Sequence, residues 1–484
     1  MNVVRKKILF NLLGGAIVVL WLFMIGLLVK KVNYTDFAER ADLMGKTSGI
    51  RSPRSDWMEI YLKDEKVGYS VNHVSPVEDD YLIQEEIFLK MNLMGQVSVL
   101  HSTTRCVVGP RFLLKTFKFK MTSGVVAFQV SGNVEDDRMN LEIGEGKARR
   151  REYVQLSETP VIGAAMAQFF KNRNVEVGQA FTFPVFDPST MAQKKVTLEA
   201  KVRETLTIKR IEYEALRLET EMWGHNLAFW LDKDGSVLKQ QGFMGMTLIR
   251  SSADAAPRGI KGRGGRDLYE QVAVRVKSKL QRPDGLTYLK LKVLGLDETD
   301  FDTAVLNEGR QKYHEGILEI TKEKIPTTNR PGLPYTDLSE ETKRLLEAEI
   351  GIESDHHAIT KKAHEIAGDI RDPVIAAKKL LEWVHGNVEK RPVISVPSAA
   401  EVLKTMVGDC NEHAVLLAAL LRASGIPARL CVGLVYARGM FLYHAWCEIY
   451  VGQWVSADPT FNQIPADVSH LKFVHAGPTR RAAV

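Results

Sequence analysis

The stretch that decides the fold of the second half of this chain runs from Gly408 to Ala414 and reads GDCNEHA. An apolar segment with helical spacing follows and extends to Leu421, and Gly425 ends it. The spacing predicts a buried helix whose first turn lies at Cys410. A buried helix is a rigid support, which a nucleophilic side chain needs.

The position of Cys410 at a helix start has an electrostatic consequence. Asp409 or Asn411 is the expected cap of this helix. The unpaired N–H groups and the positive end of the helix dipole favour a thiolate at such a position. Cys410 is therefore the candidate nucleophile.

Three short strands are predicted after this helix, at Arg429 to Ala437, Phe441 to Val451 and Trp454 to Ala457. The second strand carries His444, and Asp458 directly follows the third. A cysteine on a helix, followed by a histidine and an aspartate on neighbouring strands, is a layout for thiol catalysis. His444 would take the thiol proton, and Asp458 would hold the imidazole in one tautomer.

Side-chain alternation places a condition on this site. A two-residue turn at Gly452 and Gln453 would pair Asp458 with Cys447, which faces away from His444. The site closes only if the loop has three residues or the strand contains a bulge. We therefore predict an irregularity between Val451 and Trp454.

Several ordered motifs resemble the transglutaminase-like superfamily. They are GDCNEHA at Gly408, GIPAR at Gly425, HAW at His444, and WV followed by DPT from Trp454 to Thr460. The resemblance covers about Asp372 to Leu471, with an earlier start near Pro331 as the alternative. It implies a papain-like α+β core in which Cys410 is the nucleophile, His444 the base and Asp458 the orienting residue.

The resemblance leaves the reaction open. Family members include protein cross-linking acyltransferases, peptidases, amidases and inactive scaffolds. No glutamine shortly before Cys410 fills the papain-type oxyanion position. The Cys410 backbone N–H is one expected oxyanion donor, and the second is unassigned.

The N-terminus predicts a membrane anchor. Ile8 to Val29 is 22 residues long with Asn11 as its single polar side chain, which is enough to span a hydrocarbon core of about 30 Å. Arg5 to Lys7 precede it, so the N-terminus is expected in the cytoplasm and the bulk outside. A cleaved signal peptide is the alternative, but the apolar run is long and no small-residue cleavage site precedes Lys30.

The remaining sequence divides by composition into successive regions of an α+β protein. An antiparallel β-rich domain is expected from alternating apolar and polar residues, as in Phe112 to Lys120. A Gly/Arg linker follows; an RNA-binding Arg-Gly segment is its functional alternative. The expected regions are 1–31 for the anchor, 32–52 for a connector, 53–255 for the β-rich domain, 256–268 for the linker, 269–330 for a short β segment and 331–484 for the catalytic domain.

Two other groups of residues were candidates for chemistry. Cys431 and Cys447 would be nearly opposite if Arg438 to Met440 formed the turn, as either a disulfide or two buried thiols. His356, His357 and His364 fit no usual zinc spacing and are interpreted as solvated helix-end histidines. No metal site or cofactor is predicted. His413, one turn after Cys410, is assigned a structural role.

These observations favour a membrane-anchored, extracytoplasmic thiol enzyme that acts on an amide bond of a protein or peptide-like substrate. Hydrolysis is preferred and cross-linking transfer to an amine is second. An inactive scaffold is the rival from a different class, with an envelope partner held by the β-rich domain, and a lipid or glycan carrier function of that domain is a fourth hypothesis. The net charge of +6 is mild, so nucleic acid is not an expected partner.

Overall fold

The computed structural model describes residues 50, 52–144, 149–222, 225–242, 245–261, 267–295, 303–325 and 331–475. The predicted anchor and residues 32–49 of the connector lie outside these ranges. Within the described ranges, no helix is both long enough and apolar enough to cross a membrane.

One large sheet forms the β-rich domain. Its strands follow the order β8-β7-β6-β5-β4-β3-β2-β1-β15-β14-β13-β12-β11-β10-β9. The strands are β1 (Arg54–Leu62), β2 (Glu65–Val77), β3 (Asp80–Leu93), β4 (Gln96–Val108), β5 (Leu114–Ser123), β6 (Val126–Glu135), β7 (Arg138–Ile143), β8 (Arg150–Gln155), β9 (Val161–Ile162), β10 (Ala180–Asp187), β11 (Ala192–Ile208), β12 (Ile211–Met222), β13 (His225–Leu231), β14 (Val237–Gln241) and β15 (Met246–Ser251).

The sheet is built from hairpins, as the alternating sequence predicts. In β5 the apolar residues Phe117 and Phe119 are buried, whereas Lys118 between them and Lys115 before them are exposed. This alternation gives the sheet one packed face and one wet face. The Asp234-Gly235 pair predicts a hairpin turn, and β13 and β14 form that hairpin.

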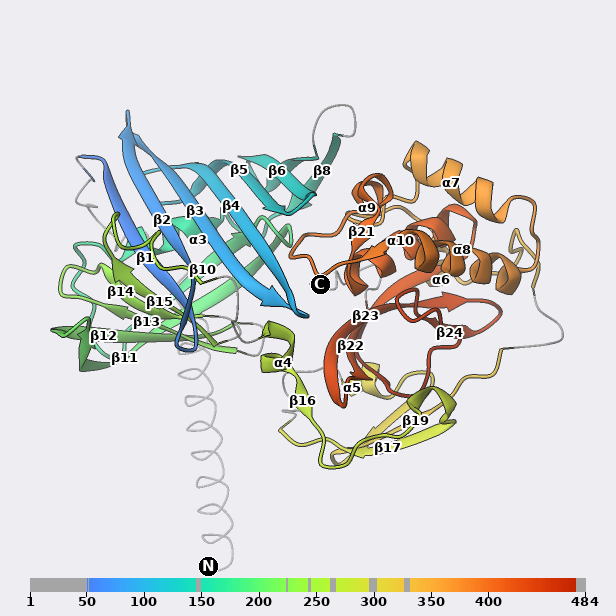
Figure 1. The fold of residues 1–484 in the computed structure, drawn as a ribbon. Helices are drawn as coiled ribbons and strands as arrows, with labels where there is room; N and C mark the ends of the chain where they lie inside the picture. Colours follow the sequence, from blue (N-terminus) through green and yellow to red (C-terminus); the bar gives the residue numbers. More distant parts are fainter. Residues whose placement is uncertain are drawn as a thin grey trace, which may run out of the picture. The chain divides into compact units, whose positions relative to one another are not determined.

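The first and last strands of the domain are joined. β1 pairs with β15 in an antiparallel register that matches Trp57 with Ser251. Helix α3 (Gly163–Phe169) contacts β3, β9 and β10, and it lies between the blue and the green strands in Figure 1. The domain therefore has an interior formed by strands from both halves of the sheet and by α3.

The chain after the β-rich domain contains a second sheet with the order β16-β23-β22-β25, in which β24 pairs with the opposite end of β23 from β16. The β17-β19-β18 sheet and a two-stranded β20–β21 ladder complete the strands. Their bounds are β16 (Val274–Arg275), β17 (Tyr288–Lys292), β18 (Gln311–His314), β19 (Ile317–Thr321), β20 (Glu389–Lys390), β21 (Val407–Gly408), β22 (Ala428–Ala437), β23 (Met440–Tyr450), β24 (Trp454–Ala457) and β25 (His470–His475).

Helices cover one face of the second sheet. Ala445, Cys447 and Ile449 of β23 belong to the same buried cluster as the helices, while Phe441 and Leu471 pack with β17–β19 on a separate core. The other helices are α4 (Leu268–Val272), η3 (Pro283–Gly285), α5 (Thr303–Leu306), α6 (Glu340–Arg344), α7 (His357–Ala367), α8 (Pro373–Asn387), α9 (Ala399–Thr405) and α10 (Cys410–Ala423).

Three details differ from what the sequence indicates. The spacing of Asp337 and Glu340 predicts a capping box, but Ser339 caps α6 and the helix begins two residues later. The Asp372-Pro373 pair predicts a helix start with Ile375 facing inward on α8, but Ile375 is 49% exposed. The β22–β23 turn has two residues, because Ala437 pairs directly with Met440.

Candidate active site

Helix α10 holds Cys410 as its first residue, as predicted. Asp409 is the cap, and its carboxylate accepts a hydrogen bond from the backbone N–H of Asn411 at 3.0 Å. The backbone N–H of Asp409 in turn donates to the Glu412 carboxylate at 2.9 Å, which completes a capping box. Ser395 donates to the second oxygen of Glu412. The start of the helix, and with it the cysteine, is therefore fixed by reciprocal hydrogen bonds.

The electrostatic surroundings of Cys410 differ from the expectation. Cys410 is 7% exposed. Burial, followed by the negative charge of Asp409 and with a contribution from Asp458, raises the pKa of the thiol well above its ordinary value. The backbone N–H of Ala445 opposes this rise by donating to the sulfur. Sequence reasoning expected the helix start to favour a thiolate, but burial and Asp409 act in the opposite direction and raise the pKa of the Cys410 thiol.

The loop that brings Asp458 to the site has the predicted irregularity. Tyr450 pairs with Trp454, so three residues form the loop, and Gly452 at φ +96° makes its turn. Ala457 consequently pairs with Cys447. Asp458, one residue further, falls on the opposite face, which is the face of His444.

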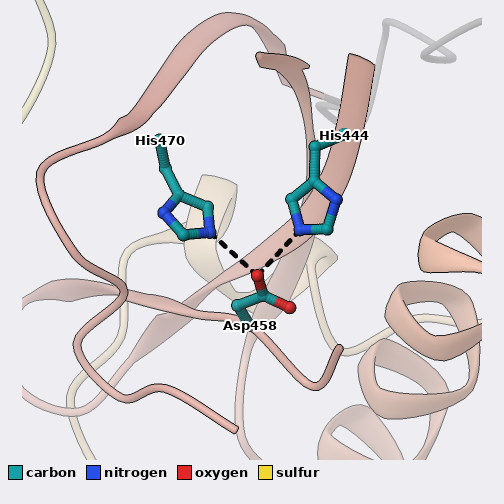
Figure 2. Close-up of side chains that lie close together, drawn as sticks. All are labelled: His444, Asp458 and His470. Atoms are coloured by element: carbon teal, nitrogen blue, oxygen red, sulfur yellow. Dashed lines mark hydrogen bonds and ion pairs between the residues drawn. The ribbon is translucent and has the colours of Figure 1, made fainter. Parts of the chain in front are cut away.

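His444 and Asp458 are joined directly. His444 Nε2 lies 2.7 Å from Asp458 Oδ2, and both residues are buried. Because a carboxylate oxygen can only accept, Nε2 carries the proton. In the neutral imidazole, Nδ1 is then an unprotonated acceptor, and Figure 2 shows this second ring nitrogen directed away from Asp458. This is the tautomer that a general base requires.

The Cys410 sulfur contacts β23, the strand that carries His444, but among the described residues it makes no direct hydrogen bond to the imidazole. The Cys410 sulfur meets the N–H of Ala445, the residue that follows His444. No hydrogen bond between Cys410 and His444 is found in the described part of the chain. A nucleophile–base contact is often longer in unliganded enzymes than during reaction.

His470 is a member of the site that the sequence reasoning missed. Its Nε2 lies 2.8 Å from the same Asp458 oxygen, and its Nδ1 lies 3.3 Å from Asp467 Oδ1, as Figure 2 shows for the Asp458 contact. Burial alone would disfavour the charge, but the hydrogen bonds to Asp458 and Asp467 raise the pKa of His470. His470 lies in β25, a strand that the sequence analysis did not predict, so no motif pointed to it.

Asp458 is held as a carboxylate by four donors. Besides the two histidines, the backbone N–H groups of Thr460 and Phe461 donate to its Oδ1 at 2.6 and 3.2 Å. Burial would raise the pKa of Asp458, but His444 and His470 hold it well below its ordinary value. The charge that orients His444 is therefore permanent near neutral pH.

The side chains of His444, Asp458 and His470 are also of the types that bind metal ions. One oxygen or nitrogen of each of His444, Asp458 and His470 lies within 4.8 Å of the others. Two ligands of one zinc ion would be about 3.3 Å apart, given bonds of about 2.0–2.1 Å in tetrahedral geometry. The 2.7 and 2.8 Å separations are shorter and match charge-assisted hydrogen bonds. The arrangement is therefore a hydrogen-bonded group and not a metal centre.

A glycine makes the approach of β25 possible. Gly433 pairs with His444 on one side and with Lys472 on the other, beside a register shift. A Cβ atom at this position would lie 1.9 Å from the carbonyl oxygen of Leu471. Only glycine fits here without displacing the backbone of the strand that carries His470.

The other candidates take structural positions. Cys431 and Cys447 are free buried thiols; because the turn has two residues, Cys431 pairs with Trp446 and not with Cys447. His413 donates from Nδ1 to the Asp409 carbonyl at 2.6 Å, and burial lowers its pKa. His356 caps α7 through its ring nitrogen.

The family comparison agrees with this geometry. Residues 360–459 match the model of the Transglutaminase-like superfamily, so the chain carries a domain of that superfamily. Cys410, His444 and Asp458 all lie within the matched range, whereas His470 lies outside it. No curated protein is detectably similar to the chain.

Three solved structures are similar to parts of the chain. A candidate cysteine protease from Cytophaga hutchinsonii is 20% identical, with 42% of this chain and 73% of that chain covered and a TM-score of 0.28. A β-barrel-like protein from Brucella abortus is 12% identical, with coverages of 42% and 96% and a TM-score of 0.32. A candidate protease from Parabacteroides distasonis is 10% identical, with coverages of 79% and 70% and a TM-score of 0.19.

Proposed function

We propose that this protein is a thiol enzyme that cleaves an amide bond, with Cys410 as nucleophile, His444 as base and Asp458 as the orienting carboxylate. The observation that carries the proposal is the His444–Asp458 hydrogen bond of 2.7 Å. It leaves Nδ1 of His444 available on the strand whose next residue, Ala445, binds the Cys410 sulfur.

The reaction follows from the resting protonation states. The Cys410 sulfur attacks the amide carbonyl carbon while its proton passes to His444. The C–N bond breaks, the amine leaves with that proton, and an acyl-thioester remains on Cys410. Water, deprotonated by His444, attacks the thioester and releases a carboxylic acid and the thiol. An imidazolium forms in each step, and the Asp458 charge stabilises it.

Because the pKa of Cys410 is raised, the thiol proton passes to His444 during the attack on the carbonyl carbon and not before it. Asp409 and Asp458 disfavour an isolated thiolate, whereas a thiolate beside a protonated His444 has a compensating cation. The backbone N–H of Cys410 at the start of α10 is the proposed first oxyanion donor.

We further propose that the enzyme is anchored by Ile8 to Val29 in the cytoplasmic membrane, with residues after Lys31 on the outer side or in the periplasm. The support is the length of the apolar segment and the basic residues before it. Protease added to intact spheroplasts should degrade the catalytic domain; full protection, with degradation only after lysis, would contradict this orientation.

Hydrolysis and transfer are separated by one experiment. The full-length protein in detergent is incubated with a mixture of envelope-derived peptides in H₂¹⁸O, with and without dansylcadaverine as a primary amine. Hydrolysis predicts ¹⁸O in new carboxylates, and acyl transfer predicts dansyl-labelled products instead. Absence of both products, under conditions in which the protein is folded, would contradict an amide-cleaving enzyme.

His470 is proposed as a positioning residue for Asp458. His470→Leu should lower the rate of the Cys410 reaction by about 10- to 100-fold, because an outer hydrogen-bond partner is lost. His470→Gln keeps a donor and should retain most of the rate. Because His470 itself titrates with a raised pKa, its loss in both variants should also move the acid limb of the pH–rate profile.

The pH–rate profile distinguishes this role from a structural one. Both variants are compared with the wild-type protein by the pH dependence of Cys410 alkylation and by thermal unfolding. A rate that falls only in proportion to the loss of folded protein, with an unmoved acid limb, would show that His470 supports the fold alone.

A further inference from the structure

A cavity lies inside the β-rich domain, between α3 and strands from both halves of the large sheet. Its volume is about 480 Å³, which is within the range of pockets that hold small molecules, about 300–1,000 Å³. Most of the wall is apolar. The apolar lining includes Phe119, Ile162, Phe186, Leu198 and Leu248.

A row of polar side chains crosses one wall of the cavity. Asp56 on β1 pairs with Asn72 on β2, Asn72 with Glu85 on β3, and Glu85 with Thr104 on β4. All four line the cavity, because directly paired residues of neighbouring strands share a face. We call these four residues the polar row.

The members of the polar row differ in their partners. Asp56 lies 3.5 Å from Lys171 Nζ, and Asn72 donates to the Ala164 carbonyl at 2.7 Å. Glu85 has no hydrogen-bond or ion-pair partner among the residues that the structure describes. Burial raises its pKa to about 7, although the side chain keeps accessible surface where it lines the cavity.

We infer that this cavity binds a cationic amphiphile, an apolar chain that carries a primary amine, with the amine paired to Glu85. An ammonium group supplies the positive charge and the donors that the carboxylate lacks. The apolar chain would cover the apolar wall. Three carboxylates line the cavity. Asp56 is paired with Lys171 and Arg54. Asp187 interacts with the charge of Lys194, so Glu85 is the one without a cation among the described residues. An anionic head group placed beside Glu85 would be repelled. This inference is independent of the proposed reaction at Cys410.

Calorimetric titration of the full-length protein with decylamine, decanol and decanoate tests the inference. The three probes share one chain and differ in head group. Decylamine should bind about 10- to 100-fold more tightly than decanol, because a charge-assisted hydrogen bond in a site without water should raise the affinity by about that factor. Glu85→Gln should abolish that difference and leave decanol binding nearly unchanged.

Two variants complete the design. Glu86→Gln is the matched control, because Glu86 is the next residue on β3, points to the other face and accepts a hydrogen bond from Tyr69 at 2.9 Å. It should leave all affinities unchanged. Ala167→Phe fills the cavity from α3 and should weaken decylamine and decanol alike; unchanged binding in this variant would place the amphiphile elsewhere and overturn the inference.

The pH dependence gives a separate readout. Decylamine affinity should rise from pH 6 to pH 8 as Glu85 loses its proton, and this rise should be absent in Glu85→Gln. The other titratable groups at the cavity are Asp56, Asp187 and Lys171, with Cys106 nearby, whose pKa burial and Glu85 raise to about 12. Equal affinity for amine and alcohol, or preference for decanoate, would overturn the inference.

Discussion

Replacing Cys410 by alanine should abolish amide cleavage, and His444→Ala should lower kcat by about 10⁴- to 10⁶-fold, because nucleophile and base act as one unit. The reason lies in the resting state of the site. Burial and Asp409 raise the pKa of Cys410. Near neutral pH the nucleophile therefore forms only when His444 accepts the thiol proton. The measurement is kcat on whichever peptide the ¹⁸O experiment identifies.

Asp458→Asn is the most informative single variant of this set. An amide at this position can offer only one acceptor oxygen and presents an N–H₂ group to the site, whereas His444 and His470 both approach Asp458 with Nε2. Both histidines contact the same oxygen, so an amide oxygen in that place puts the N–H₂ group against the backbone N–H groups of Thr460 and Phe461, and the reverse orientation puts it against both histidines. Donors face donors in either case and the charge that stabilises the imidazolium is lost, so we expect a loss of about 10⁴-fold in kcat.

His364→Ala is the control for these variants, because His364 is exposed on α7 and is not one of the proposed catalytic residues. It should leave kcat unchanged. Turnover that survives His444→Ala to within tenfold would rule out His444 as the base.

Glu448→Gln should lower the free energy of unfolding by about 3–5 kcal/mol, the usual effect of removing one partner of a buried ion pair. Arg429 Nε lies 2.8 Å from one Glu448 oxygen, and Lys472 Nζ lies 2.6 Å from the other. The three residues lie on β22, β23 and β25 and are all buried. Without the carboxylate, the two cations stay buried and keep Glu308 as their carboxylate partner.

Denaturant unfolding monitored by fluorescence measures this effect. Glu340→Gln is the surface counterpart, because Glu340 pairs with Lys343 at 2.6 Å on the exposed side of α6, and it should cause no measurable change. A Glu448→Gln variant as stable as the wild-type protein would show that the two cations find other partners.

The Glu448 effect should depend on pH in a defined direction. Although burial opposes it, Lys472 and Arg429 lower the pKa of Glu448 in the folded protein. A lowered folded-state pKa means that the stabilisation is fully present above the ordinary glutamate value of 4.5 and is lost as the pH falls through the lowered value. The stability difference between wild-type protein and Glu448→Gln should therefore shrink below about pH 4.5.

Local signals in the sequence predicted the parts of the site that depend on local structure. Asp409 and Asp372 cap their helices as expected, because a cap is satisfied by residues two or three positions away. The irregularity between Val451 and Trp454 was predicted from alternation, since either a three-residue loop or a bulge places Asp458 on the face of His444, and the structure has the three-residue loop.

Features that depend on distant contacts were not predicted. His470 reaches Asp458 only because β25 pairs with β22 beside Gly433, and nothing in the local sequence of His470 indicates that pairing. The raised pKa of the Cys410 thiol was missed for the same reason, because its largest cause, burial, comes from tertiary packing. The joining of β1 to β15 is a third case of a long-range contact without a local signal.

The most direct test of the catalytic assignment is the pH dependence of iodoacetamide alkylation at Cys410, followed by peptide mass spectrometry in the wild-type protein and in His444→Ala. The buried thiols Cys431 and Cys447 serve as internal controls in the same samples. We expect a two-step wild-type profile: near neutral pH the thiol is alkylated while its proton passes to His444, and at high pH the thiol ionises without the base and the rate rises again. His444→Ala should keep only the second rise. Identical profiles in the two proteins, with Cys410 no faster than Cys431 and Cys447, would contradict the assignment of Cys410 and His444 as a catalytic pair.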